Sequence, residues 1–136
     1  MSTLFRASLL VLFAFCLVWA PALAVDAPQV SFPRPGDALQ GLVVITGSTD
    51  LAGAQSVEVS FNYSSSNPDT WFLIQQSRAA VKEGALAVWD TTTIADGYYR
   101  LRVQVFLQDG NKAEVIVPGL RVRNYTPVET ETPTPS

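Results

Sequence analysis

Residues 89–117 read WDTTTIADGYYRLRVQVFLQDGNKAEVIV, and this stretch decides the fold. Apolar side chains occupy alternate positions from Tyr99 to Leu107, and polar side chains, among them two arginines, fill most of the positions between them. This alternation is typical of an antiparallel strand with one buried and one solvated face. The pattern predicts a long strand, a tight reversal and a return strand.

The reversal falls at Asp109-Gly110-Asn111, after which the alternation resumes with Ala113, Val115 and Val117. Pairing apolar residues with apolar residues places Val105 opposite Val115. A two-residue loop would place Val105 opposite Glu114, so we expect a loop of three or five residues. In the three-residue form the loop is Asp109-Gly110-Asn111, with Asn111 in the left-handed conformation.

Five further segments have strand signals bounded by turn residues. The segment 79–89 is ambiguous because its alanines are compatible with a helix, but Gly84 costs a helix interior about 1 kcal/mol relative to alanine. We therefore expect a turn at 82–84 and a strand after it. We expect 27–32 to lie at a sheet edge and 39–46, which is apolar on both faces, to be central. The predicted strands are 27–32, 39–46, 57–63, 71–76 and 86–89.

Together these segments predict an all-β fold, an antiparallel β-sandwich of about seven strands. Parallel strands need long crossover connections, usually helical, and the sequence offers no convincing helix. The sandwich is expected to span residues 25–125.

Both ends of the chain differ in composition from the sandwich. Residues 1–24 combine Arg6, an apolar run of about a dozen residues and the small-residue site Ala22-Leu23-Ala24, which predicts a cleaved signal peptide, with an uncleaved anchor as the alternative. Residues 126–136, TPVETETPTPS, predict a disordered Thr/Pro-rich tail or linker. We therefore expect a secreted or cell-surface protein with no membrane insertion after cleavage.

The composition excludes several kinds of chemistry. The chain has no histidine, and its one cysteine, Cys16, lies in the predicted signal peptide. The mature domain has no disulfide and lacks the usual general base, thiol nucleophile and soft-metal ligands. We expect no cofactor, no metal and no enzymatic activity. The net charge of −3 argues against a nucleic-acid partner, and we expect a monomer.

The aspartates are predicted to serve turns and caps rather than a site, because each lies beside Gly, Pro or Thr. A calcium site made by Asp37, Asp50 or Asp96 is the alternative, although no D-x-D-x-D spacing supports it. Asn62-Tyr63-Ser64 and Asn124-Tyr125-Thr126 match the glycosylation pattern, which matters only in a eukaryotic source.

Several of these motifs resemble one known family. They are Pro35-Gly36-Asp37, Val44-Ile45-Thr46-Gly47, Trp89-Asp90-Thr91 and Asp96-Gly97-x-Tyr99-x-Leu101. Over about residues 27–125 the chain resembles the immunoglobulin-like or fibronectin type III-like modules of bacterial cell-surface and secreted proteins. The resemblance implies that Tyr99 forms a tyrosine corner and that the module is a noncatalytic spacer, adhesion or carbohydrate-associated unit.

The candidate ligand-binding residues are aromatic: Trp71, Trp89, Tyr98 and Tyr125. As an alternative, Trp71 and Trp89 pack the core or its rim. The leading hypothesis is a noncatalytic module that acts as a spacer or makes weak contacts with an unknown protein or cell-envelope glycan. The alternative is a carbohydrate-binding module with an exposed aromatic platform, and an enzyme with paired acids is the third.

Overall fold

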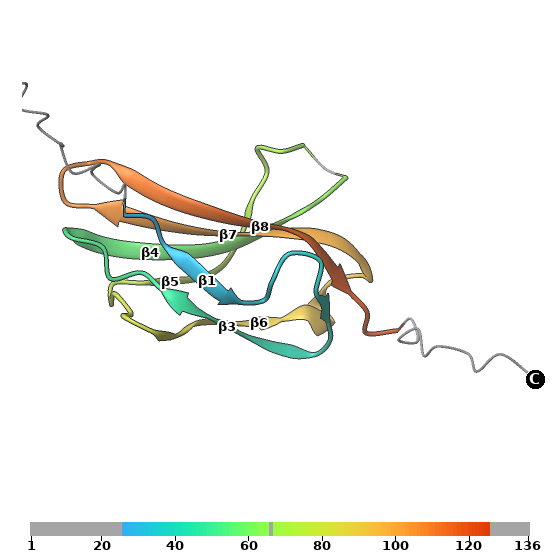
Figure 1. Cartoon of the computed structure of the whole chain (residues 1–136). Coiled ribbons are helices and arrows are strands. Elements are labelled where there is room, and N and C mark those ends of the chain that lie inside the picture. The colour runs from blue at the N-terminus through green and yellow to red at the C-terminus, as the bar shows by residue number, and fades with distance from the viewer. Residues whose placement is uncertain (1–25, 66, 126–136) are drawn as a thin grey trace, which may run out of the picture.

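The computed structural model describes residues 26–65 and 67–125, which form two β-sheets packed face to face (Figure 1). The all-β sandwich predicted from the sequence is confirmed. The signal peptide and the Thr/Pro-rich tail lie outside the described residues and stay predictions. The elements are β1 (Gln29–Phe32), β2 (Ala38–Leu39), β3 (Leu42–Ser48), β4 (Ala54–Tyr63), β5 (Phe72–Ser77), β6 (Gly84–Asp90), the 3-10 turn η1 (Thr91–Thr93), β7 (Gly97–Leu107) and β8 (Lys112–Val122).

One sheet has the strand order β1-β3-β6 and the other β2-β8-β7-β4-β5. The edge position of β1, the central position of β3 and the strand assignment of β6 agree with the sequence predictions. Among the described residues, no helix is long and apolar enough to cross a bilayer.

The predicted single strand 39–46 is wrong, because the chain changes sheets within it. Leu39 ends β2 in the five-stranded sheet, and Leu42 begins β3 in the three-stranded sheet. Gly41 lies between them at φ 66°, a conformation that residues with a Cβ adopt only at a cost. This kink divides the segment, so residues 26–65 and 67–125 contain eight strands.

One strand pair is parallel, contrary to the expectation of a purely antiparallel sandwich. β2 runs alongside β8 through Ala38↔Arg121 and Leu39↔Val122, and the Leu39 carbonyl accepts a bond of 2.9 Å from Arg123 N. No dedicated crossover helix is needed, because the rest of the domain lies between these two strands in the sequence.

The β7–β8 hairpin has the predicted loop length but a different register. Val105 pairs with Ala113 and Val103 with Val115, so the predicted Val105–Val115 pair is wrong. The loop is 108–110, and Gly110 rather than Asn111 is left-handed, at φ 86°. Glycine takes this conformation without a Cβ penalty. The observed pairing shifts each partner by two positions, so the apolar faces still coincide.

The core lies between the sheets and includes Trp89 and Tyr99. The Tyr99 hydroxyl donates a hydrogen bond of 2.5 Å to the Ala95 carbonyl, so the residue has the contact of a tyrosine corner. Burial raises the pKa of Tyr99, and the neighbouring Tyr63 and Asp96 raise it further. The other core residues are Leu39, Val43, Ile45, Val57, Val59, Leu86, Ala87, Leu101, Val103, Val105, Val117, Leu120 and Val122.

Candidate functional site

The four aromatic candidates do not come together as one platform. Trp89 is only 2% exposed and stacks on Phe61 in the core, with ring centroids 5.2 Å apart. It alternates with the exposed Val88 on β6, and its face of the strand points into the sandwich. Trp89 is therefore excluded as a surface for sugar rings.

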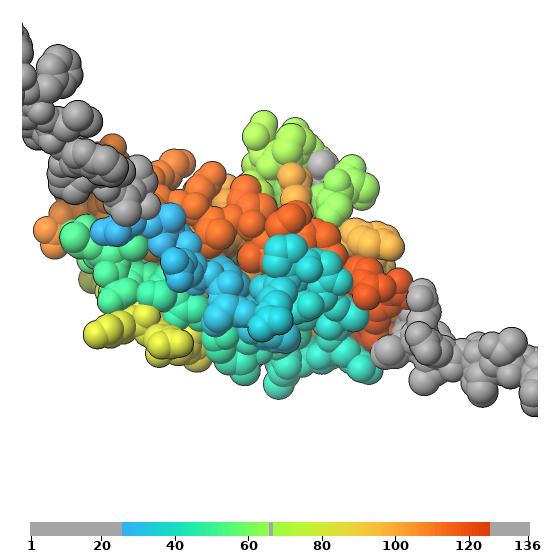
Figure 2. All heavy atoms as spheres, in the orientation of Figure 1, coloured from blue at the N-terminus to red at the C-terminus, as the bar shows by residue number. Residues whose placement is uncertain are grey.

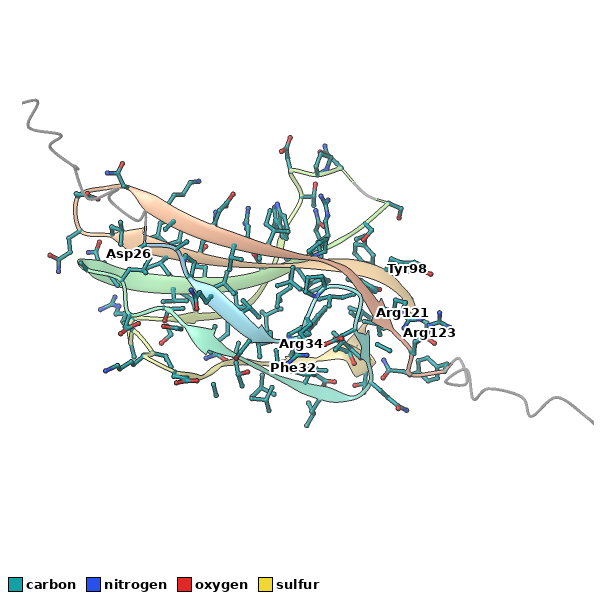
Figure 3. The ribbon with its side chains drawn as sticks, viewed as in Figure 1. Asp26, Phe32, Arg34, Tyr98, Arg121 and Arg123 are labelled. Carbon is teal, nitrogen blue, oxygen red and sulfur yellow. The ribbon has the colours of Figure 1, made fainter. Side chains whose placement is uncertain are left out.

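Tyr98 and Tyr125 are exposed, at 60% and 78%. Tyr98 opposes Arg121 on the neighbouring strand, and Figure 3 shows both near the end of the sandwich where Arg123 also lies. The backbone N–H of Tyr125 bonds to the Asp96 carboxylate at 3.0 Å. No ring contact joins either tyrosine to Trp71 among the interactions of the described residues.

Trp71 lies on the outer face of the five-stranded sheet, just before β5, and two guanidinium groups lie over its indole. The Arg102 Cζ is 4.2 Å from the ring centroid and the Arg100 Cζ is 5.6 Å from it. Distances below about 6 Å are favourable for cation–π attraction. We call Trp71, Arg100 and Arg102 the Trp71 cluster.

The alternation of β7 explains why both arginines face outward. Leu101 and Val103 are fully buried, so Arg100 and Arg102 project from the opposite face of the strand. The loop between β4 and β5 projects from the five-stranded sheet, as Figures 1 and 2 show, and it brings Trp71 back to the start of β5. Trp71 was predicted from the sequence as a candidate ligand-binding residue, but its contact with these arginines was not predicted.

Each arginine is held by the residue directly opposite on β4. Arg100 Nε donates to Asn62 Oδ1 at 2.9 Å, and Arg102 Nε donates to Ser60 Oγ at 3.3 Å. Asn62 is fully buried and also donates to the Pro68 carbonyl at 3.5 Å, which ties the loop to the sheet. The side-chain amide of Asn62 is therefore buried and hydrogen-bonded, so the Asn62-Tyr63-Ser64 glycosylation pattern does not present an accessible asparagine.

The neighbours of Arg102 along the sheet are uncharged. Ser60 and Ile116 oppose it on β4 and β8, and Leu73 opposes Ser60 on β5. Leu73 and Ile116 are exposed apolar side chains on this face. Burial lowers the pKa of Arg102, and Glu114 and Glu58 partly offset that effect. The guanidinium is thus partly desolvated without a carboxylate in the same cross-strand row.

A separate polar network closes one end of the sandwich around Asn124. Its Oδ1 accepts from Gly41 N at 2.8 Å, and its Nδ2 donates to the Thr91 carbonyl at 2.8 Å. The Asp96 carboxylate accepts from the backbone N–H groups of Asn124 and Tyr125. These bonds join the β2–β3 kink, η1 and the end of β8, so Asn124 has a structural role.

Other aspartates also bind local donors, as predicted for turns and caps. Asp37 accepts from Arg34 N, Asp90 caps η1 through Thr92 N, and Asp109 accepts from Asn111 N. In residues 26–65 and 67–125 no group of three or more His, Cys, Asp or Glu side chains is arranged to hold a metal ion.

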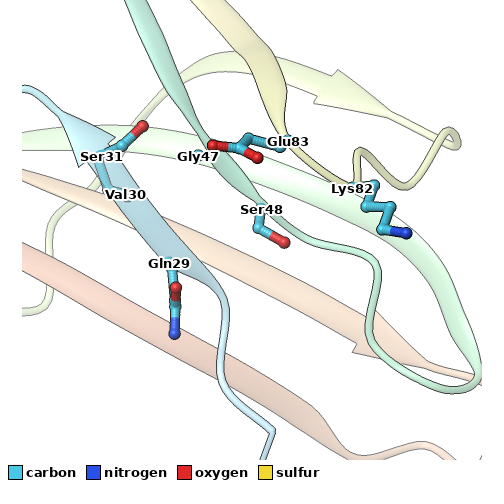
Figure 4. A pocket seen from close by; sticks show the side chains of 7 residues that line it. All are labelled: Gln29, Val30, Ser31, Gly47, Ser48, Lys82 and Glu83. Carbon is cyan, nitrogen blue, oxygen red and sulfur yellow. The ribbon is translucent and has the colours of Figure 1, made fainter.

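Two surface hollows are polar and open. One of about 300 Å³ lies along β1 and β3, where Ser31, Ser48 and Lys82 contribute to its wall (Figure 4). The other, of about 570 Å³, lies at the β4–β5 side of the five-stranded sheet and includes Glu58, Arg78 and Phe106. Neither contains the Trp71 cluster.

Comparison with known proteins identifies the fold. No protein-family model and no curated protein matches the chain. A structure of the fibronectin(III)-like modules of Clostridium thermocellum CbhA is 21% identical, with a TM-score of 0.51 over 71% of this chain and 46% of that one. The endo-beta-1,4-mannanase from Thermotoga petrophila is 18% identical, with a TM-score of 0.52 over 73% of this chain and 20% of that one. The chain has a fibronectin type III-like fold and spans less than half of each matched structure.

Proposed function

We propose that this chain is a noncatalytic fibronectin type III-like module that works outside the cytoplasm as a spacer and makes weak contacts with proteins or glycans. The observation that carries the proposal is the position of the two ends. Asp26 and Arg123 lie toward opposite ends of the sandwich (Figure 3). A chain that enters at one end and leaves at the other separates whatever is joined to it by the length of the domain.

The strand pairing suits such a role. β1 is bonded to β3, and β8 is bonded to both β7 and β2. Because ladder hydrogen bonds run across the strands, a force along the strands loads many of them together in shear. The two matched structures, the fibronectin(III)-like modules and the mannanase, are longer than this chain, which covers 46% and 20% of them, and this is consistent with a unit placed in series with others.

The chemistry of the described carboxylates supports a noncatalytic role. Asp37, Asp90, Asp96 and Asp109 bind backbone N–H groups in turns and at strand ends. A pair of catalytic carboxyl groups would have to face each other across a cleft, about 5–10 Å apart. The extracytoplasmic location rests on the predicted signal peptide.

Single-molecule force spectroscopy tests the spacer role. With handles at Asp26 and Tyr125 the domain should unfold in one event, because the load shears the ladders. A matched preparation with handles at Asp26 and Asp109 pulls from the same end of the sandwich, since the β7–β8 loop lies near the start of β1 (Figure 1). That geometry peels strands one bond at a time and should need a clearly lower force. Equal forces in the two geometries would contradict the proposal.

A glycan-contact function is the second candidate, and the Trp71 cluster is the observation that favours it. An aromatic side chain on a flat sheet face stacks on sugar rings when one ring face is accessible. The aromatic platform predicted from the sequence loses one candidate, because Trp89 is buried. Trp71, with two arginines over its ring, remains as the candidate for contact with a sugar ring.

A further inference from the structure

The Trp71 cluster presents two fixed cations at a defined spacing. Arg100 and Arg102 are two residues apart on β7, which places their Cα atoms about 7 Å apart at roughly 3.4 Å per residue. Both lie over one indole and both bond through Nε to β4. An arginine that is already held in place loses less side-chain entropy when it binds a ligand.

The hydrogen bonds to Asn62 and Ser60 use the Nε donors. A guanidinium has five N–H donors, so its terminal nitrogens still offer the paired N–H groups that match a carboxylate. Among the described residues, the hydrogen bonds and ring contacts of Arg100 and Arg102 are those with Asn62, Ser60 and the Trp71 ring. Glu114 and Glu58 act on Arg102 electrostatically, without a hydrogen bond or ion pair to its guanidinium.

The surrounding face is basic although the whole chain carries a net charge of −3. Cations outnumber anions among the outward residues of its strands. The cations are Arg100, Arg102, Lys112 and Arg121, and the anions are Glu58 and Glu114. Glu114 is also bound to Gln104 Nε2 at 2.9 Å, one cross-strand row from Arg102. The sign of this face is complementary to an anionic partner.

Apolar surface beside the cations indicates what the anion is attached to. Leu73 and Ile116 are exposed on either side of Arg102, and the Trp71 indole lies above it. A sugar ring that bears a carboxylate combines an apolar C–H face with a planar anion. The apolar and aromatic surfaces suit the ring, and the guanidinium groups suit the carboxylate.

We propose that Trp71, Arg100 and Arg102 form a binding site for an acidic polysaccharide, with uronate carboxylates bound by the arginines and a sugar ring packed beside the indole. This site deepens the glycan-contact part of the proposed function. The spacer role does not depend on it.

The test is calorimetric titration of the mature chain at low salt with a hexamer of galacturonic acid, and with the same hexamer after reduction of its carboxyl groups. We expect binding of the acidic hexamer that weakens as salt is added, because charge pairs at the surface are screened. The reduced hexamer should bind at least tenfold more weakly. Equal binding of the two hexamers, or no binding of the acidic one, would overturn the proposal.

Variants locate the site. Arg102→Gln and Arg100→Gln should each weaken binding severalfold, and the double variant should abolish it. Arg121→Gln removes a cation from the same sheet face away from the cluster and should have a small effect. Arg102→Lys keeps the positive charge but removes the paired N–H donors of the guanidinium. A loss of affinity in this variant therefore supports recognition of the carboxylate independently of net charge. Full affinity in the double variant would refute the site.

Thermal melts of each variant show whether it is folded. Because the Trp71 cluster also fastens the β4–β5 loop, Trp71→Phe provides a second comparison that retains a ring. Polyglutamate of equal charge tests the class of partner: weaker binding than the hexamer supports a glycan site, and equal binding contradicts it. The force measurement on the two handle geometries judges the spacer role separately.

Discussion

Replacing Asn124 with alanine tests the network that closes one end of the sandwich. The change removes two side-chain hydrogen bonds of 2.8 Å, one from Gly41 N and one to the Thr91 carbonyl. Thr91 is fully buried, so water cannot readily replace the lost partner at that site. Each bond contributes about 0.5–1.5 kcal/mol net, and an unsatisfied buried group adds about 1–3 kcal/mol. These terms sum to about 2–6 kcal/mol, and because Gly41 is only half-buried and water can reach its N–H, we expect the free energy of unfolding to fall by the lower part of that range, about 2–3 kcal/mol.

Urea denaturation and thermal melts measure this change. For a domain of this size about 1 kcal/mol corresponds to a shift of about 4–8 °C in Tm, so Asn124→Ala should melt about 10–20 °C lower. Asn111→Ala is the matched control, because the Asn111 side chain is exposed and bonds to Asp109 within the loop. It should change Tm by only a few degrees. An Asn124→Ala protein as stable as the control variant would show that the Asn124 hydrogen bonds do not hold this end of the fold.

Three further perturbations follow from the core and its edges. Tyr99→Phe removes the hydrogen bond to Ala95 and should cost about 1–2 kcal/mol of unfolding free energy. Burial raises the pKa of Tyr99 above 10.0. The stability that the protonated Tyr99 contributes is therefore complete below pH 10 and is lost as the pH rises through the folded-state pKa. Tyr99→Phe should flatten this loss of stability at alkaline pH in urea titrations, and an unchanged pH dependence would contradict the role given to Tyr99. Acrylamide should quench the fluorescence of the half-buried Trp71 in part and that of the buried Trp89 hardly at all. The fluorescence of a Trp71→Phe mature chain should therefore resist quenching. Strong quenching in this variant would show that Trp89 is accessible. Gly47→Ala would place a Cβ 1.9 Å from the Gln29 carbonyl oxygen, so β1 must shift away from β3. The backbone amides of β1 should then lose protection from hydrogen exchange. Unchanged protection of these amides would refute the close packing of Gly47 against β1.

Period-two alternation was sufficient for the strands with one wet face. In β4 and β7 the sequence alternates apolar residues, which face the core, with mostly polar residues on the outer face, and both strands were predicted from that pattern. The pattern did not show that Ser60, Asn62 and Gln104 on the outer face are themselves buried. Alternation fixes facing but not register, since a shift of two residues leaves the faces unchanged. For this reason the predicted β7–β8 loop had the correct length but was placed at 109–111 instead of 108–110.

In the segment 39–46, hydrophobic periodicity was insufficient to predict the strand boundaries. Its apolar residues include Leu42 and Val44, which lie exposed on the outer face of the three-stranded sheet. An apolar run on both faces was therefore no sign of a strand buried on both faces. At the kink, Gly41 N donates a hydrogen bond to Asn124 Oδ1, 83 residues later in the chain, and the local sequence holds no signal for this contact.

The candidate site was only partly accessible from sequence. Trp71 was singled out as an aromatic residue, and the outward positions of Arg100 and Arg102 followed from the alternation of β7. Their meeting was not predictable, because it depends on how the β4–β5 loop returns to the sheet. The burial of Trp89 depends on the facing of β6, whose short pattern of alanines, leucine and valine gave no clear alternation.

The proposed contact surface of this module is the outer face of the five-stranded sheet, at the Trp71 cluster. The most direct measurement is a titration of the isotope-labelled mature chain with galacturonic acid hexamer, followed by two-dimensional NMR. We expect the largest shifts at the Trp71 indole N–H and the Arg100 and Arg102 Nε–H groups, with little change on the outer face of β3 and β6. Shifts concentrated on β3 and β6, or spread evenly over the surface, would contradict it.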